Sequence, residues 1–291
     1  MSAIRLTLLI FLTMIAFAGN SLLCRSALSG TGIDAASFTG IRLASGAVIL
    51  YLLIMLRQRS LSVDGNWSSA LALFGYAASF SFAYISLPAG TGALLLFGAV
   101  QATMIGYGLY RGERINPRQG AGMALALLGL VVLLLPGTQA PSILGAALML
   151  GAGVFWGIYT LRGRGANDPT RETAGNFLRT LPLAAAISLL LFDRASPDPA
   201  GIAYAIASGA LASGLGYALW YAALPRLSAN TAATVQLSAP ALAAIGGVVL
   251  LNEPLSIRLT LGSIAILGGI AIFIRNERTL PGVQTKAAGG D

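Results

Sequence analysis

The feature that most constrains this chain is a series of apolar runs, each about twenty residues long, separated by short polar gaps. A helix of about twenty apolar residues crosses the roughly 30 Å hydrocarbon layer of a membrane. Transmembrane helices are therefore predicted at residues 4–24, 36–56, 67–87, 89–110, 119–136, 143–162, 173–192, 200–223, 230–251 and 258–275. The gaps leave no room for a sizeable soluble domain, so the predicted fold class is an all-α polytopic membrane protein with ten transmembrane helices.

The composition agrees with this prediction. Only 10% of the 291 residues are charged and 56% are hydrophobic, whereas soluble domains carry about 25% charged residues. Most of the 36 glycines lie inside apolar runs, where small residues let helices approach closely. The first run is long for the apolar region of a signal peptide, and no small-x-small cleavage site precedes a soluble domain, so we interpret it as the first membrane helix.

The basic residues are unevenly distributed between alternate gaps. Of eighteen Lys and Arg, thirteen lie on the side shared by both termini; Arg25, Arg194 and Arg258 lie on the opposite side, and Arg42 and Arg179 lie inside predicted spans. Because cytoplasmic loops are enriched in Lys and Arg, both termini are predicted to be cytoplasmic, with the chain in the cell inner membrane. The net charge of +8 would suggest nucleic acid in a soluble protein, but no basic stripe with interleaved aromatics supports such a partner.

The second half of the chain resembles the first. The stretch G-T-G-A-L-L-L-F-G-A-V-Q from Gly90 aligns without gaps on N-T-A-A-T-V-Q-L-S-A-P-A from Asn230, and this alignment pairs Glu113 with Glu253. With three residues of slippage, further pairs are Leu87–Pro88 with Leu224–Pro225, Arg42 with Arg179, and Arg25 with Arg162. The predicted units are residues 1–137 and 138–278, with 279–291 as a disordered cytoplasmic tail. Five spans per unit would invert the second copy, and such repeats place a substrate site where the halves meet.

Two related segments carry a resemblance to a known family. They are G-E-R-I-N-P-R-Q-G-A-G-M-A-L-A-L-L-G-L-V-V-L-L from Gly112 and N-E-P-L-S-I-R-L-T-L-G-S-I-A-I-L-G-G-I-A-I-F from Asn252. Both resemble the end of a repeat in the EamA family of the drug/metabolite transporter superfamily, and F-W-G at Phe155 and F-x-x-x-R at Phe38 are similar to other positions in that repeat. The nearest resemblance is to YddG-type amino-acid exporters, although the usual Trp-Gly of the first helix is Ala18–Gly19 here. The resemblance implies a ten-helix exporter of amino acids and related metabolites.

Uncharged polar and aromatic residues in mid-span are the candidate cavity lining. Amide and hydroxyl groups can bind both ends of a zwitterion, although in membranes they also bond neighbouring helices. Aromatic residues near interfaces often act as membrane anchors instead. The predicted substrate-binding residues are Asn20, Tyr84, Phe97, Gln101, Trp156, Tyr159, Gln236 and Ser238, with Tyr76, Phe80, Tyr217 and Trp220 as further candidates.

Charged and proline residues are candidates for gating or structural roles. Arg42 and Arg179 lie near predicted helix starts, where they could snorkel to headgroups in a shared structural role or bind a substrate carboxylate. Pro88 and Pro225 precede predicted helices and mark compact hairpins that act either as hinges or as tight turns, and Pro240 predicts a kink. No Asp, Glu or His lies deep in a predicted span, which favours facilitated transport over tight proton coupling.

Other functions find little support. With no histidine, a single cysteine, Cys24, and no lysine before Lys286, the chain has few groups for an intramembrane catalytic site or a metal site, so no cofactor and no metal are expected. A G-x-x-x-x-G-K-S/T motif is absent, which argues against ATP hydrolysis. The predicted function is export of neutral, aromatic and related amino acids by a monomer using alternating access. The alternatives are export of another small metabolite or drug, a passive pore, and, remotely, a membrane-embedded enzyme.

Overall fold

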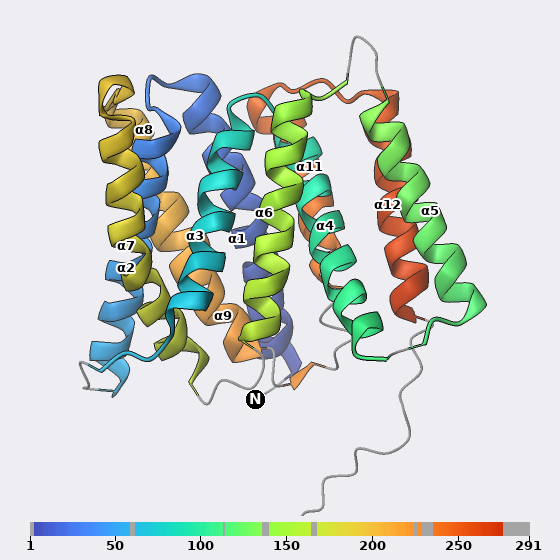
Figure 1. Cartoon of the computed structure of the whole chain (residues 1–291), viewed down its shortest axis with the longest axis horizontal. Coiled ribbons are helices and arrows are strands. Elements are labelled where there is room, and N and C mark those ends of the chain that lie inside the picture. The colour runs from blue at the N-terminus through green and yellow to red at the C-terminus, as the bar shows by residue number, and fades with distance from the viewer. Residues whose placement is uncertain are drawn as a thin grey trace, which may run out of the picture.

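The computed structural model describes residues 3–58, 62–112, 114–135, 140–163, 168–223, 226–227 and 235–275, and these residues form helices and short connections without a strand (Figure 1). The first half contains α1 (Ala3–Gly30), α2 (Ala35–Gln58), α3 (Trp67–Tyr84), α4 (Ala89–Tyr110) and α5 (Pro117–Leu134). The second contains α6 (Ile143–Arg162), α7 (Pro169–Leu190), η1 (Phe192–Arg194), α8 (Pro199–Ile206), η2 (Ala207–Leu215), α9 (Gly216–Ala223), α11 (Ser238–Leu251) and α12 (Ile257–Arg275).

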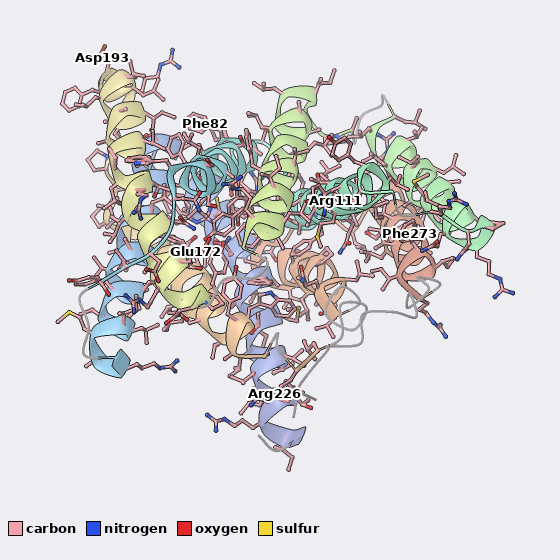
Figure 2. All side chains as sticks on the ribbon, turned by 60° about the horizontal axis from the view of Figure 1, so that its bottom comes forward. Phe82, Arg111, Glu172, Asp193, Arg226 and Phe273 are labelled. Carbon is pink, nitrogen blue, oxygen red and sulfur yellow. The ribbon has the colours of Figure 1, made fainter. Side chains whose placement is uncertain are left out.

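The long helices run side by side between two faces of the molecule (Figure 1). Helix α1 begins and α12 ends on the same face, which we call the terminal face; we call the opposite one the distal face. Asp193 and Arg226 lie at opposite ends of the molecule, and many side chains along the helices between these ends are apolar (Figure 2).

In the described part of the chain, seven helices are long and apolar enough to cross a membrane: α1, α2, α4, α5, α6, the continuous α8–η2–α9 segment and α12. The expectation of several membrane-spanning helices is therefore confirmed. Three further expected spans are helical but less apolar or shorter. Helix α3 carries serines and tyrosines, α7 carries Arg171, Glu172 and Arg179, and α11 has only 14 residues.

Polar residues in the gaps start the helices. The side chains of Asn66, Asn116, Ser142, Asp168 and Asp198 accept hydrogen bonds from backbone N–H groups in the first turns of α3, α5, α6, α7 and α8, respectively. These N–H groups have no partner within their own helix, so each cap removes an unsatisfied donor. The gaps thus fix where the helices begin as well as separating the spans.

Helix α1 lies at the centre and contacts helices of both halves, including α3, α4, α9 and α11. Helices α5 and α12 pack closely along each other and form a pair at one side of the molecule (Figure 1). A Cβ atom added to Gly122 of α5 would lie 2.6 Å from the carbonyl oxygen of Gly269 in α12, so this seam requires glycine.

Two helices differ from their predicted course. Helix α1 continues to Gly30, six residues beyond the predicted end at residue 24, so Asn20 lies well inside the helix and not near its outer end as predicted. In the ninth predicted span, helix is interrupted by a turn at Leu237, and Pro240 lies in the first turn of α11. Proline clashes with the carbonyl four residues before it, here that of Gln236, which accounts for a break where a kink was predicted.

Candidate functional site

A small cavity lies at the centre of the bundle, among α1, α3, α4, α6, η2 and α9. We call it the central pocket; its lining residues are Phe17, Asn20, Tyr76, Phe80, Leu96, Phe97, Trp156, Ala212 and Tyr217. Its volume is about 20 Å³, which is enough for roughly one water molecule. The structure therefore represents a conformation in which the side chains have closed around the pocket.

Aromatic rings form most of the pocket wall. The ring of Trp156 lies between those of Tyr76 and Tyr217, with centroid separations of 4.8 and 4.9 Å. Phe80 packs against Tyr76 at 5.4 Å, and Phe17 meets Tyr217 edge-on at 6.0 Å. Such rings offer apolar faces to a ligand, and their polar atoms fix its orientation.

A buried chain of hydrogen bonds runs along one side of the pocket. The Ser208 hydroxyl donates to Asn20 Oδ1 at 2.6 Å, and Asn20 Nδ2 donates to the Tyr76 hydroxyl oxygen at 3.1 Å. Arg42 Nη2 donates to the same Tyr76 oxygen at 3.0 Å. Because this oxygen already accepts two hydrogen bonds, the Tyr76 hydroxyl proton is available for a further acceptor.

Arg42 is buried, with 1% of its surface exposed. Its guanidinium carbon lies 5.2 Å from the centre of the Tyr76 ring and 4.8 Å from that of Phe80, in cation–π geometry. The prediction that Arg42 could snorkel to the headgroups is wrong, because its side chain turns inward against these two rings. Its Nη1 atom has no hydrogen-bond partner.

The nine-residue π-helix η2 brings the second half against Arg42. Its Ser208 and Ala212 contribute to the hydrogen-bond chain and to the pocket wall. A Cβ atom on Gly209 would overlap the Arg42 carbonyl oxygen, so glycine is needed for this close approach. π-Helical turns occur often at functional sites, because the extra residue per turn shifts which side chains face inward.

Three of the eight predicted substrate-binding residues line the central pocket: Asn20, Phe97 and Trp156. Tyr159 packs behind Trp156 at 5.5 Å, and its hydroxyl accepts from Asn176 at 3.4 Å. Tyr84 lies toward the distal face, where its ring packs edge-on against Phe80 at 4.8 Å and its hydroxyl donates to the Ala89 carbonyl at 3.2 Å.

The remaining predicted residues lie away from the pocket. Gln101 lines a groove of about 490 Å³ between α4, α6 and the α5–α12 pair, and not the pocket that Phe97 lines. Gln236 is half-buried just before the helix break, and the exposed Ser238 hydroxyl donates to the Val235 carbonyl at 2.7 Å. The two glutamines therefore do not meet as a symmetric pair in this conformation. Pro225 lies outside the described residues.

The two repeat-related arginines have different surroundings. Arg179 Nη1 donates to the carbonyls of Asp64 at 2.7 Å and Gly175 at 2.9 Å, and so attaches the connection between α2 and α3 to α7. Arg42 instead faces buried rings. The expectation of a shared role for the pair is therefore wrong.

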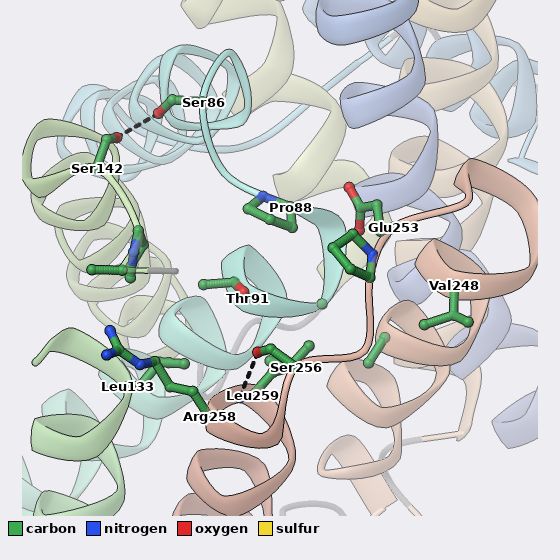
Figure 3. Close-up of a pocket in the computed structure, with 15 residues that line it drawn as sticks. Ser86, Pro88, Thr91, Leu133, Ser142, Val248, Glu253, Ser256, Arg258 and Leu259 are labelled. Carbon is green, nitrogen blue, oxygen red and sulfur yellow. Dashed lines mark hydrogen bonds between the residues drawn. The ribbon is translucent and has the colours of Figure 1, made fainter. Parts of the chain in front are cut away.

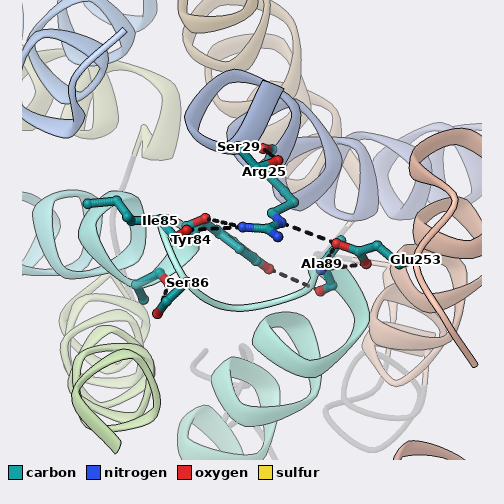
Figure 4. Close-up of polar contacts among 8 residues, drawn as sticks. Arg25, Ser29, Tyr84, Ile85, Ser86, Ala89 and Glu253 are labelled. Carbon is teal, nitrogen blue, oxygen red and sulfur yellow. Dashed lines mark hydrogen bonds and ion pairs between the residues drawn. The ribbon is translucent and has the colours of Figure 1, made fainter. Parts of the chain in front are cut away.

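A network at the distal face, shown in Figure 4, links α1, the α3–α4 turn and Glu253 in the connection between α11 and α12. Arg25 Nε lies 3.2 Å from Glu253 Oε1, and Arg25 Nη1 donates to the carbonyls of Tyr84 at 3.0 Å and Ile85 at 3.1 Å. The Ala89 N–H donates to the Glu253 carboxylate at 2.8 and 3.0 Å. We call these five residues the distal latch. Glu253 is thus ion-paired and partly buried. The repeat pattern alone did not identify the residue with which it forms the ion pair.

A second pocket of about 320 Å³ lies beside the latch on the distal face (Figure 3). Pro88, the N-cap residue of α4, lines this pocket together with Glu253, Arg258 and several hydroxyl side chains. Ser86 and Ser142 bond across one edge at 2.7 Å. This distal pocket is larger than the central pocket and is lined by several hydroxyl groups, whereas the central pocket is lined mainly by aromatic rings.

The sequence matches the description "EamA-like transporter family" over residues 5–135 and 143–275. The chain belongs to the EamA-like transporter family. The resemblance noted from the sequence is therefore confirmed at the level of the family, whereas the narrower resemblance to YddG-type exporters stays a prediction.

Relatives of this EamA-like protein cover most of its length. An uncharacterized protein of Pseudomonas aeruginosa is 57% identical over 93% of this chain and 94% of its own. The threonine/homoserine exporter RhtA of Salmonella typhimurium is 30% identical over 87% of this chain and 88% of its own. A protein of known crystal structure superposes with a TM-score of 0.68 at 23% identity, over 96% of this chain and 100% of that one, which shows a shared fold.

These findings establish the class of the protein. The EamA-like chain is a multi-pass protein of the inner membrane, and the members of its family and its RhtA relatives are transporters and not enzymes. A small-molecule substrate and a membrane environment follow from the same relatives.

Sequence reasoning missed Phe17, Leu96, Ser208 and Ala212 as parts of this EamA-like pocket. Phe17 is one helical turn before Asn20 and could have been found from that spacing. The π-helix that turns Ser208 and Ala212 inward leaves no recognisable signal in the small-residue run A-S-G-A-L-A-S-G-L.

Proposed function

We propose that this protein is a secondary transporter that exports amino acids across the inner membrane by alternating access around the central pocket. The observation that carries the proposal is the composition of that pocket, in which aromatic rings surround Asn20 and Tyr76 with no acidic side chain in the lining. Rings bind an apolar or amphipathic side chain, and the amide and hydroxyl bind polar groups of a zwitterion. The relative that exports threonine and homoserine supports an amino-acid cargo.

The proposed topology is ten spans in two inverted units, residues 1–137 and 138–278, with both termini cytoplasmic. The two matched ranges, 5–135 and 143–275, support two units, and the common face of the start of α1 and the end of α12 supports an even number of spans. Helices α1, α3 and α4 of one unit and α6, η2 and α9 of the other supply the pocket lining, as expected for a site between repeats.

The proposed cycle opens the pocket to one face at a time in a single chain. The distal latch supports closure of the distal face, because it attaches α1 to the α3–α4 turn and to the start of the α11–α12 connection. Facilitated movement is favoured over tight proton coupling, since the pocket lining has no carboxylate to carry a proton.

The test is counterflow into proteoliposomes that hold the purified protein, with labelled amino acids outside and unlabelled ones inside. The panel begins with threonine and homoserine and extends to neutral and aromatic amino acids. Saturable uptake that needs internal substrate is expected, with a lower apparent affinity in Trp156→Ala, which removes the central ring. Uptake no faster than into empty liposomes for every amino acid rejects the cargo, and uptake that does not saturate indicates a pore.

Two further measurements test coupling and topology. Concentration of substrate many-fold by an imposed pH gradient alone would contradict facilitated transport. For topology, Ser2→Cys and Thr285→Cys are introduced separately into a Cys24→Ala background and labelled with a membrane-impermeant maleimide. Labelling of the two cysteines from different sides of the membrane would reject the ten-span arrangement.

A further inference from the structure

The buried guanidinium of Arg42 lacks a negative partner in the structure. The described residues contain two salt bridges, Arg25 with Glu253 and Arg171 with Asp64, and neither involves Arg42. The groups that interact electrostatically with Arg42 are Tyr76, Tyr217 and Cys24, all of which are neutral in their ordinary state. A charged side chain inside a membrane protein is costly unless it is paired, and such residues mark functional sites by default.

The hydrogen-bonding capacity of Arg42 is also incompletely used. A guanidinium has five N–H donors in a planar fork that matches the two oxygens of a carboxylate. Nη2 is bonded to the Tyr76 hydroxyl at 3.0 Å, whereas the buried Nη1 has no partner. An anion with two oxygens in one plane would satisfy both the charge and the free donor.

The site is adjacent to the central pocket. Tyr76 and Phe80, the two rings against which Arg42 stacks, are themselves part of the pocket lining. The pocket of about 20 Å³ is too small for any amino acid, so lining side chains must move when a substrate enters. Because Tyr76 and Phe80 contact both the pocket and Arg42, a sideways displacement of these two rings would bring the pocket into contact with the guanidinium.

We propose that Arg42 binds the carboxylate of the transported amino acid, with the Tyr76 hydroxyl as a second donor. Tyr76 already accepts from Arg42 and Asn20, so its own proton is the one that it can donate, and a carboxylate oxygen would replace its neighbouring hydrogen-bond partner, the Tyr217 hydroxyl. The substrate side chain then lies against Trp156 and Tyr217. This inference rests on the proposed function and adds to it the group that selects acids over amides or amines.

The test measures competition in the counterflow assay. Exchange of a labelled amino acid is inhibited with the unlabelled acid, its carboxamide and its decarboxylated amine. For the wild-type protein, the acid is expected to compete roughly 10- to 100-fold better than the amide, the range for a charge-assisted hydrogen bond to a buried group. Arg42→Gln is expected to abolish this preference, and Arg42→Lys to retain part of it, because lysine keeps the charge but not the planar fork.

Arg179→Gln is the matched control, since Arg179 corresponds to Arg42 in the repeat but bonds only backbone carbonyls. Whatever its transport rate, this variant is expected to keep the wild-type preference for the acid. Tyr76→Phe preserves the ring and removes the hydroxyl, so it is expected to weaken the preference even if the Arg42 variants do not fold. The same change loses the hydrogen bonds from Asn20 and Arg42, which is why the readout is the acid-to-amide ratio and not the rate.

The outcomes separate this inference from the proposed function. If the wild type exchanges amino acids but the amide competes as well as the acid, export stands and the carboxylate site is wrong. The site is also wrong if Arg42→Gln keeps the full preference. If no amino acid exchanges, the proposed function fails, and the inference that rests on it fails too.

Discussion

At the residue scale, the central pocket depends on a few polar atoms buried among rings. Asn20 is 6% exposed and bonds both Ser208 of η2 and Tyr76 of α3, so a single amide joins three helices. Removing one partner of a buried hydrogen bond leaves the other partner unsatisfied, and this costs more than the bond itself contributes. Asn20 is therefore expected to matter for stability as well as for binding.

We expect Asn20→Leu, which preserves approximate volume, to lower the free energy of unfolding by roughly 1–3 kcal/mol, because the Ser208 hydroxyl loses its acceptor and the Tyr76 oxygen loses one of its two donors. The measurement is thermal unfolding in detergent. Unfolding is monitored by the maleimide labelling of Cys24, whose thiol is fully buried in the folded protein. Ser238→Ala is the control, since Ser238 is exposed and bonds only the nearby Val235 carbonyl. An unchanged unfolding temperature for Asn20→Leu would show that the amide is not structurally important.

The lowered pKa of the Asp34 carboxyl predicts that the stability of the protein depends on pH. Burial would raise the pKa of its carboxyl, but hydrogen bonds from Ser37, Ser196 and Ala36 outweigh this effect and hold the pKa below its usual value of 3.8. A carboxyl whose pKa is lower in the folded state stabilises the protein above its unfolded pKa, and this stabilisation is lost as pH falls through the folded pKa.

We therefore expect Asp34→Asn to unfold at a lower temperature than the wild type at pH 7, with the difference narrowing below about pH 4. The amide oxygen of asparagine can still accept from Ala36 and Ser37 in the first turn of α2, but its NH2 group cannot accept from the Ser196 N–H, so the variant loses that bond as well as the charge. The change of the difference with pH, and not its size at pH 7, therefore reports the charge. A difference that stays constant between pH 7 and pH 3 would contradict this account.

Sequence reasoning at this scale identified residue types better than positions. Asn20, Phe97 and Trp156 were found because polar or aromatic side chains in mid-span are rare, whereas Gln101 satisfied the same criterion and faces a lateral groove. The rotation of each helix about its own axis depends on packing against its neighbours. A polar residue near the boundary between two helix faces does not show which of these faces is turned toward the pocket.

At the element scale, the approach of η2 to α2 sets the shape of the pocket. We expect Gly209→Ala to push these helices apart, because its Cβ atom would overlap the Arg42 carbonyl oxygen. Overpacking of this kind costs roughly 1–3 kcal/mol, and moving Ser208 and Ala212 should also weaken substrate binding. The measurements are the unfolding temperature and the concentration dependence of counterflow.

Gly151→Ala provides the control for this prediction. Gly151 is also helical, but a Cβ atom there would meet no atom within 4 Å. Alanine is favoured over glycine in a helix by about 1 kcal/mol, so this variant is expected to be at least as stable as the wild type. Equal behaviour of the two variants would mean that the close contact between η2 and α2 can relax without cost.

The helices themselves were largely predictable. Runs of about twenty apolar residues and the polar residues between them gave the starts of α3, α4 and α6 to the residue and those of α1, α2, α8 and α12 within one. The turn at Leu237 and the π-helix were not predicted, because each depends on local backbone geometry that hydrophobicity does not encode. Helix α1 was predicted too short because its polar end, from Arg25 to Gly30, continues the same hydrogen-bond pattern.

At the scale of the whole molecule, the distal latch joins parts of the chain that are 228 positions apart, from Arg25 to Glu253. We expect Arg25→Gln to increase the time for which the distal face is open, because the pair and the bonds to the α3–α4 turn are weakened together. The measurement is the labelling rate of Thr91→Cys, which lines the distal pocket, with an impermeant maleimide in a Cys24→Ala background.

A loss of about 1.4 kcal/mol from the latch corresponds to a roughly tenfold increase in the labelling rate if opening precedes reaction. Arg194→Gln removes an exposed positive charge elsewhere on the distal side and serves as the control. Equal labelling rates in Arg25→Gln and the control would indicate that other contacts hold this face closed.

The internal repeat predicted where a site should form but not how its two sides would differ. Arg42 and Arg179 correspond in sequence, yet one is buried against aromatic rings and the other attaches a connection at the terminal face. Once two copies are joined in one chain, each arginine can diverge independently. Similarity between the halves therefore predicts shared backbone structure better than shared side-chain roles.

The small volume of the central pocket also determines whether the protein lets protons leak across the membrane while it is not transporting. Room for about one water cannot hold the continuous file of waters that protons need to hop across roughly 30 Å of hydrocarbon. Resting copies in this conformation would leave the electrical and pH differences across the membrane undisturbed. Cells could thus accumulate the protein ahead of need without running down the gradients that power their other transport.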